Sequence, residues 1–267
     1  MLQKLQNLSL LSKNCHPAEK MSGPLAGKTA LITGGSKGIG AATSLLLAKS
    51  GANVAINYSS DSSAAEDIAK QIGHEQSLLI QGDAGSIPDI ERMVSETVNK
   101  FGKIDIVIPC AGIMLLKNLE ATTEADFDKS YHLNVKGPYF LCQKAAPHMP
   151  EGSHIVLIST TQCTATTVQA PYLLYNSTKG AIEQMTRVMC KDLAPKGISV
   201  NAVSPGPTGT ELFYRGKTEQ MLKMIAGFSP MGRIGKPEEI AEAIVWLSSG
   251  SSSWISGQIL RANGGMA

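Results

Sequence analysis

Tyr175 and Lys179 are separated by four positions, and a tyrosine and a lysine at that spacing can carry out proton transfer together. On a helix both side chains project from one face and can reach the same ligand. A free phenol, with a pKa of about 10, donates its proton poorly at neutral pH, and a neighbouring ammonium favours the phenolate and lowers that pKa. Among six tyrosines, only Tyr175 has lysine at this offset. A solvated pair with no catalytic role is the alternative.

A glycine-rich turn follows the first predicted strand, with the sequence Thr33-Gly34-Gly35-Ser36-Lys37-Gly38-Ile39-Gly40. Glycine allows a tight turn close to a phosphate, and the helix that follows offers unpaired N–H groups and the positive end of its dipole. The turn therefore predicts nucleotide binding, with a purely structural turn as the alternative. Its glycines fall as G-x-x-x-G-x-G, not as the G-x-G-x-x-G of long-chain dinucleotide enzymes. The residues expected around the phosphates are Gly34, Ser36, Lys37, Gly38, Ile39 and Gly40.

With these motifs in this order, the sequence resembles the short-chain dehydrogenase/reductase family over residues 28–267. The motifs that carry the resemblance are the glycine turn, Asp83-Ala84, Cys110-Ala111-Gly112, Asn134-Val135-Lys136-Gly137, Tyr175-Asn176-Ser177-Thr178-Lys179, and Ser204-Pro205-Gly206 followed by Thr208 and Thr210. The pattern is similar to both the polyhydroxynaphthalene reductases and the carrier-protein ketoacyl reductases. The resemblance implies an oxidoreductase that reduces a ketone to a secondary alcohol, reversibly, by hydride transfer from NADPH.

The resemblance also implies roles for the catalytic residues. Tyr175 is the general acid in reduction, Lys179 lowers its pKa and holds the nicotinamide ribose, and the backbone carbonyl of Asn134 binds a water of a proton relay. The family places a serine at the end of the fifth strand to hold the substrate carbonyl. Here the register puts Thr160 at that position, and Ser159 is an almost equal alternative.

Charge at the end of the second predicted strand distinguishes the two dinucleotides, because an NAD enzyme usually places an acidic residue there. The end reads Asn57-Tyr58-Ser59-Ser60, and Lys37 can add a positive charge for a ribose 2′-phosphate. We therefore expect NADP(H), with NADPH bound at least about tenfold more tightly than NADH. The alternative is that Lys37 is only a solvated surface lysine.

The remaining cofactor contacts follow from the resemblance. Asp83 resembles the family residue that accepts from the adenine amino group, and Thr210 is the expected carboxamide contact. Cys110 stands where the family more often has asparagine, and we expect cofactor binding to survive that change. The other implied contacts are Ala84, Ala111, Gly112, Tyr175, Lys179, Pro205, Gly206 and Thr208.

Apolar strands alternate with helical patterns along the chain, as in the βαβ units of a parallel sheet. The predicted fold is α/β, a single Rossmann-type, doubly wound dinucleotide-binding catalytic domain over residues 23–267 with a seven-stranded, mainly parallel sheet. Residues 1–22 are expected to be a disordered tail, and a short lid is expected near 207–236. The predicted strands are 29–33, 53–58, 77–81, 104–109, 154–159, 199–203 and 258–261. The predicted helices are 41–50, 64–72, 90–101, 125–149, 175–193 and 238–248, with a short one at 219–226.

Apolar side chains in the lid favour an aromatic, polyketide-like or steroid-like ketone over a sugar. Five apolar residues near the C-terminus suggest an assembly surface, with core packing as the alternative. By its resemblance the protein is expected to be a homotetramer, with a dimer as the alternative. The lid residues are Leu212, Phe213, Tyr214, Met221, Met224, Phe228 and Met231, and the C-terminal ones are Trp246, Leu247, Trp254, Ile255 and Ile259.

Composition excludes several other classes. The chain has 267 residues, 43% of them hydrophobic, and a net charge of +2, which gives no reason to expect nucleic acid or a membrane as partner. Five cysteines and five histidines show neither a disulfide framework nor metal-ligand spacing. We expect a cytoplasmic protein without a metal. The alternatives to a ketone reductase are a catalytically impaired NADP(H)-binding regulatory protein and a non-redox enzyme on the same fold.

Overall fold

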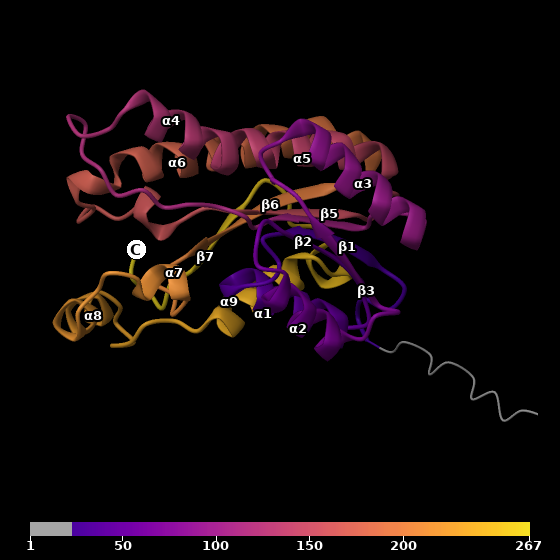
Figure 1. The fold of residues 1–267 in the computed structure, drawn as a ribbon, viewed down its shortest axis with the longest axis horizontal. Coiled ribbons are helices and arrows are strands. Elements are labelled where there is room, and N and C mark those ends of the chain that lie inside the picture. The colour runs from indigo at the N-terminus through magenta and orange to yellow at the C-terminus, as the bar shows by residue number, and fades with distance from the viewer. Residues whose placement is uncertain (1–22) are drawn as a thin grey trace, which may run out of the picture.

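The computed structural model describes residues 23–267, which fold around one sheet of seven strands (Figure 1). All strand pairs are parallel, in the order β3-β2-β1-β4-β5-β6-β7. This confirms the predicted doubly wound α/β fold. The expected tail at residues 1–22 lies outside the described residues. The strands are β1 (Thr29–Thr33), β2 (Asn53–Tyr58), β3 (Ser77–Gln81), β4 (Ile106–Pro109), β5 (His154–Ile158), β6 (Ser199–Pro205) and β7 (Ile259–Ala262).

Helices cover both faces of the sheet (Figure 1). α1 (Gly38–Lys49), α2 (Ser62–Ile72) and α9 (Pro237–Leu247) lie on one face, and α3 (Ile87–Phe101), α5 (Gly137–Ala145) and α6 (Leu173–Leu193) on the other. Successive strand residues therefore enter different cores: Ile32 packs with Leu47 and Ile244, whereas Leu31 packs with Leu141 and Ile182. Burial on both faces explains why the strands read as continuous apolar runs.

The helix predicted over 125–149 is in fact three successive segments and a final 3-10 turn (Ala146–His148). α4 (Glu124–Tyr131) is followed by a π-helical turn (His132–Lys136) and then by α5. The spacing of apolar residues does not show this change. A π-helical turn is a single turn with i→i+5 hydrogen bonds inside an otherwise continuous helix, so it hardly alters that spacing. The interruption contains Asn134.

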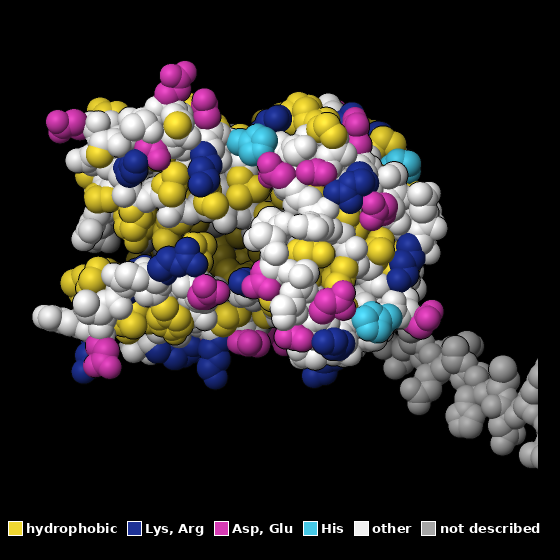
Figure 2. Space-filling view, viewed as in Figure 1, with side chains coloured by type: hydrophobic (Ala, Val, Ile, Leu, Met, Phe, Trp, Pro, Cys, Tyr) yellow, Lys and Arg dark blue, Asp and Glu magenta, His cyan; other side chains and the backbone are white. Residues whose placement is uncertain are grey.

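The expected lid carries α7 (Glu211–Tyr214), which periodicity did not indicate, and α8 (Glu219–Ala226). Both helices lie beyond the sheet, with α4 and the beginning of α6 across from them (Figure 1). Figure 2 shows a hollow with hydrophobic walls between these two parts of the molecule. Six apolar lid side chains are exposed: Leu212, Tyr214, Met221, Met224, Phe228 and Met231.

No helix within residues 23–267 combines the length and the apolar character that crossing a bilayer requires.

Candidate active site

The glycine turn joins β1 to α1, and close packing explains its glycines. Gly34 has a φ of +63°, and a Cβ there would lie 2.9 Å from the Cα of Ala111. A Cβ on Gly40 would overlap the carbonyl oxygen of Gly34. A side chain at either position would therefore push apart the turn and the segment that follows β4.

The first turn of α1 is open to an anion. Lys37 occupies the N-cap position with an extended backbone and makes no side-chain capping hydrogen bond. The first N–H groups of a helix without such a cap, together with the helix dipole, favour a bound phosphate. The glycine turn, Ser36 and Ile39 included, thus fits a dinucleotide pyrophosphate.

Asn57, at the end of β2, ties the glycine turn to β3. Its side chain is 2% exposed, donates to the carbonyls of Ile80 (3.2 Å) and Gly82 (3.0 Å), and accepts from the Gly34 N–H (3.4 Å). The Asn57 amide hydrogens, which the sequence suggested for a ribose phosphate, are therefore already used inside the protein. The groups that face solvent at this strand end are those of Ser59 and Ser60, with Tyr58 partly exposed beside them.

Asp83 follows β3 and is held by two hydrogen bonds. Its Oδ1 accepts from the Gly85 N–H at 2.9 Å, and its Oδ2 lies 2.9 Å from Nε2 of His132 in the π-helical turn. Partial burial opposes ionisation, but the bonds from Gly85 and His132 outweigh it and lower the pKa of Asp83. An ionised, half-exposed carboxylate with free lone pairs is suited to accept from an amino group, and the next residue, Ala84, is buried.

The segment after β4 connects the glycine turn to the catalytic residues. The Ala111 N–H donates to Oγ1 of Thr33 at 3.2 Å. A Cβ on Gly112 would lie 3.3 Å from Oδ1 of Asn134 and 3.9 Å from Nζ of Lys179. Burial raises the pKa of the Cys110 thiol to about 11, although Lys179 acts in the opposite direction. Cys110 therefore contributes a neutral, compact group here.

Asn134 is buried in the π-helical turn and clamps two neighbouring segments. Its Nδ2 donates to the Ile113 carbonyl at 2.9 Å and to Oγ1 of Thr178 at 3.1 Å, and its Oδ1 accepts from the Ile113 N–H at 2.9 Å. The side chain thus fixes the segment after β4 against α6. The role implied by the family lies in the backbone carbonyl, and π-helical turns often place such groups at functional sites.

Tyr175, Lys179 and Glu183 lie four residues apart along α6, and each contacts the end of β5. Nζ of Lys179 donates to the Ile158 carbonyl at 2.8 Å, and Oγ of Ser159 donates to Oε1 of Glu183 at 2.9 Å. The Thr160 hydroxyl lies beside the Tyr175 phenol and acts to lower its pKa, against the larger effect of burial. Residues 158–160 at the end of β5 therefore contact three residues on one face of α6. Of the two hydroxyls that the sequence left open, the structure brings Thr160 to Tyr175.

Burial dominates the proton affinities of Tyr175 and Lys179. It raises the pKa of Tyr175, and the Thr160 hydroxyl only partly opposes this. Burial also lowers the pKa of Lys179 to about 8. The sequence led us to expect a lowered phenol pKa from the nearby ammonium. Nζ of Lys179 lies 5.8 Å from the centre of the Tyr175 ring, and the desolvation of the phenol outweighs it.

The residues after β6 run alongside the glycine turn. A Cβ on Gly38 would lie 3.0 Å from Cγ2 of Thr210, so Thr210 packs against the phosphate-binding turn and not only beside the expected carboxamide. Oγ1 of Thr208 donates to the Gly206 carbonyl at 2.8 Å. Pro205 ends β6 and Gly206 follows it, and the closeness of Gly206 to Asn263 excludes a side chain at Gly206.

Three charged or titratable residues near the site were missed in the sequence. Asp61 lies 2.6 Å from Lys37, His132 contacts Asp83, and Glu183 contacts Ser159. Asp61 follows Ser60 directly, and Glu183 continues the four-residue spacing of Tyr175 and Lys179, so both had a signal in the sequence. His132 had none, because its contact depends on the π-helical turn.

Comparison with known proteins agrees with this geometry. A family model described as enoyl-(acyl carrier protein) reductase matches residues 34–267. An uncharacterized oxidoreductase of Bacillus subtilis, YhdF, is 42% identical over 91% of this chain and 85% of its own. Versicolorin reductase 1 of Aspergillus parasiticus is 36% identical over 90% of this chain and 97% of its own. A short chain dehydrogenase of Burkholderia cenocepacia, solved in complex with NADP, has a TM-score of 0.86 and 31% identity, covering 91% of this chain and 99% of that one.

Proposed function

The chain belongs to the short-chain dehydrogenase/reductase family, and from that premise we propose that it reduces a ketone to a secondary alcohol, reversibly, with NADPH as hydride donor and Tyr175 as general acid. The observation that carries the proposal is the convergence of Thr160, Tyr175, Lys179 and Asn134 on one site at the end of β5. When bound, NADPH supplies the hydride, and the protein supplies position and a proton.

The glycine turn and its neighbours hold the dinucleotide in this proposal. The uncapped start of α1 takes the pyrophosphate, with Thr210 packed against the same turn. The carboxylate of Asp83 accepts from the adenine amino group, and Tyr58, Ser59 and Ser60 border the adenosine ribose. The NADP bound to the Burkholderia cenocepacia relative supports the choice of dinucleotide. Ala111 and Gly112, close to Lys179, border the nicotinamide ribose.

The proton follows a path made by residues of this chain. Tyr175 gives its hydroxyl proton to the carbonyl oxygen of the substrate as the carbon gains the hydride, so the ketone becomes an alcohol and Tyr175 a phenolate. In this proposal the Thr160 hydroxyl, which acts to lower the pKa of Tyr175, stabilises the negative charge that develops as the proton is transferred. Lys179, still protonated below its pKa of about 8, stabilises the same phenolate. Asn134 serves the relay that returns a proton to Tyr175.

The substrate class follows from the walls of the hollow beside the lid. Methionine and aromatic side chains of α7 and α8 are exposed around it, and such side chains adapt to bulky apolar ligands. We infer a large ketone of aromatic, polyketide-like or steroid-like character. The relative named versicolorin reductase supports this inference.

Further copies of the chain are the proposed partners. Trp254 is 99% exposed, which rules out core packing for this residue, and Trp246 on α9 is 43% exposed. A second apolar face runs along α4, α5 and α6, where Tyr139 and Val188 are exposed beside a pocket of about 750 Å³. Exposed apolar patches of this kind mark association sites. We propose a homotetramer built on these two surfaces.

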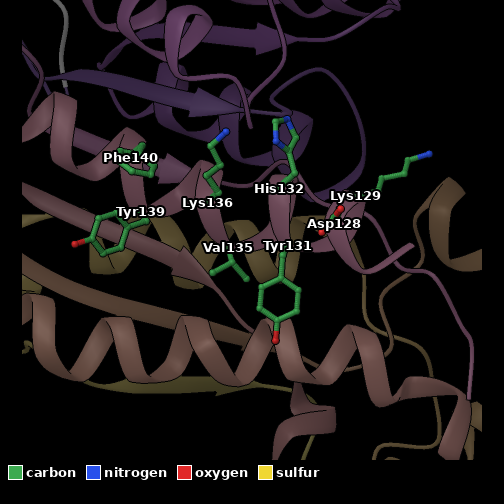
Figure 3. A pocket seen from close by; sticks show the side chains of 8 residues that line it. All are labelled: Asp128, Lys129, Tyr131, His132, Val135, Lys136, Tyr139 and Phe140. Carbon is green, nitrogen blue, oxygen red and sulfur yellow. The ribbon is translucent and has the colours of Figure 1, made fainter. Parts of the chain in front are cut away.

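Figure 3 shows the adjoining pocket of about 590 Å³ on α4, the π-helical turn and α5. Tyr131, Val135 and Tyr139 point to one side of this helical run, and His132 and Lys136 to the other. Tyr131 stacks on the exposed Phe127 at 4.3 Å between ring centres. The pocket thus extends the apolar face toward the π-helical turn. The proposed interface and Asn134 therefore belong to the same helical segment.

We place the protein in the cytoplasm, where four described cysteines, all free, stay reduced.

A panel of aromatic, polycyclic and aliphatic ketones, followed by loss of NADPH absorbance, tests the proposed function. The proposal expects turnover of at least one bulky ketone. Binding of NADPH without turnover of any ketone favours the catalytically impaired regulatory protein, and a product formed without NADPH consumption favours a non-redox enzyme.

A further inference from the structure

Lys37, the cation of the glycine turn, is paired with a carboxylate. Its Nζ lies 2.6 Å from Oδ2 of Asp61 and 3.9 Å from Oε2 of Glu211 in the lid helix α7. Asp61 also caps α2, because its Oδ1 accepts from the Ala64 N–H at 3.0 Å. One carboxylate thus joins the start of α2 to the glycine turn, and it follows directly on the strand end that borders the adenosine ribose.

We propose that Asp61 limits the preference of this chain for NADPH over NADH, in opposition to Lys37. The inference rests on the proposed function, since it concerns the same dinucleotide site. A ribose 2′-phosphate that approaches Lys37 meets an ammonium already engaged by one anion and a carboxylate of like charge beside it. A ribose 2′-hydroxyl instead finds in Asp61 an acceptor for its proton.

Geometry separates Asp61 from the other acid near Lys37. Glu211 is farther from the ammonium, its side chain is 69% exposed against 42% for Asp61, and it extends from the lid, not from the strand end next to the ribose. Screening by water and salt weakens such an exposed, more distant charge. Asp61 is therefore the acid whose removal changes the choice of cofactor. With both residues present, the preference for NADPH is smaller than the tenfold or more expected from Lys37 together with a strand end that lacks a carboxylate.

The test is titration of NADPH and of NADH into the full chain by isothermal calorimetry, which needs no turnover. Asp61→Asn removes the charge and keeps the capping oxygen, since asparagine caps helices as well as aspartate does. It should tighten NADPH about fivefold relative to NADH. Glu211→Gln, the matched loss of one carboxylate, should change that ratio by less than about twofold. Lys37→Gln should weaken NADPH about tenfold and leave NADH nearly unchanged.

An unchanged ratio in Asp61→Asn, or an equal rise in Glu211→Gln, overturns the inference and leaves the proposed function standing. Failure of both dinucleotides to bind the wild-type chain overturns the inference together with the cofactor assignment. Absence of ketone turnover counts only against the proposed function, because the binding ratio is measured without substrate.

Discussion

The Ser159 hydroxyl donates to the Glu183 carboxylate at 2.9 Å, and this bond separates the roles of two adjacent hydroxyls at the end of β5. Ser159 is 2% exposed and engaged with α6 on the side of Glu183, whereas the next hydroxyl, that of Thr160, reaches Tyr175. This arrangement supports the proposal that Thr160, and not Ser159, takes the position at which the family more often has a catalytic serine. Threonine keeps the hydroxyl and adds a methyl group and a stiffer χ1.

Thr160→Ala should lower kcat/KM for ketone reduction by about 10²–10³, the usual effect of removing one donor to a developing oxyanion. Thr160→Ser keeps the hydroxyl and should stay within about tenfold of wild type. Steady-state kinetics with a ketone from the panel measure both. A Thr160→Ala enzyme as active as wild type contradicts the assignment.

Ser159→Ala is the matched control one position away. It should leave kcat/KM nearly unchanged and cost about 1 kcal/mol of stability, because the bond to Glu183 is lost. Urea denaturation and the same kinetic assay check the two halves of this prediction. A kinetic loss as large as that of Thr160→Ala would return the catalytic role to Ser159.

Burial of Lys179 should make stability depend on pH. Its pKa is about 8 in the folded chain against an ordinary 10.5, so folding disfavours the charged form. That cost is complete below pH 8 and disappears above 10.5, and the wild type should therefore gain stability relative to Lys179→Met between these values. The gain reaches at most about 3 kcal/mol. Urea denaturation of both chains at several pH values measures it, and a constant difference between them contradicts the prediction.

Asn134→Ala should destabilise the fold by about 2–4 kcal/mol, because both backbone groups of the partly buried Ile113 lose their partner and the buried Thr178 hydroxyl keeps only its bond to the Tyr175 carbonyl. Asn118→Ala is the exposed counterpart, where the side chain accepts only from the Ala121 N–H, and it should cost about 1 kcal/mol or less. Comparison of the two denaturation midpoints tests the clamp. Equal losses of stability in the two variants would show that Asn134 does not clamp the segment after β4 against α6.

Trp254→Arg should convert the proposed tetramer into a smaller species, because it places a charge at the position of the most exposed aromatic residue described. Leu119→Arg, at a residue that is 79% exposed in the segment after β4, should leave the mass unchanged. Light scattering at assay concentration measures both. A monomeric mass for fully active wild-type enzyme contradicts the assembly altogether.

The sheet and most helices could be predicted from the sequence because the central strands are buried on both faces and the longer helices bury part of their surface against the sheet. β1, β2 and β3 begin and end at the predicted residues. The π-helical turn around Asn134 could not, since it changes the helix without changing the apolar periodicity. Side chains used inside the protein, such as the Asn57 amide, were not foreseen either, because their partners lie on other strands.

The candidate site could be predicted where its residues lie close together in the sequence, within one helix or one loop. Tyr175 and Lys179 belong to one helix, and the glycine turn belongs to one loop. Asp61 was missed because the choice between NAD and NADP was predicted from Lys37 and residues 57–60 alone. The loop after β2 brings the next residue, Asp61, into contact with Lys37. The raised pKa of Tyr175 depends on burial by distant segments, which no local pattern shows.

The central claim is that Tyr175 donates the proton in ketone reduction, and Tyr175→Phe tests it most directly because only the hydroxyl is removed. The measurement is kcat with NADPH and a turned-over ketone, together with the Kd of NADPH from calorimetry. We expect kcat to fall by about 10²–10⁴ while the Kd stays within about twofold of wild type. Lys179→Ala, in contrast, should impair both values. A normal kcat in Tyr175→Phe would contradict the account and place the proton donor elsewhere.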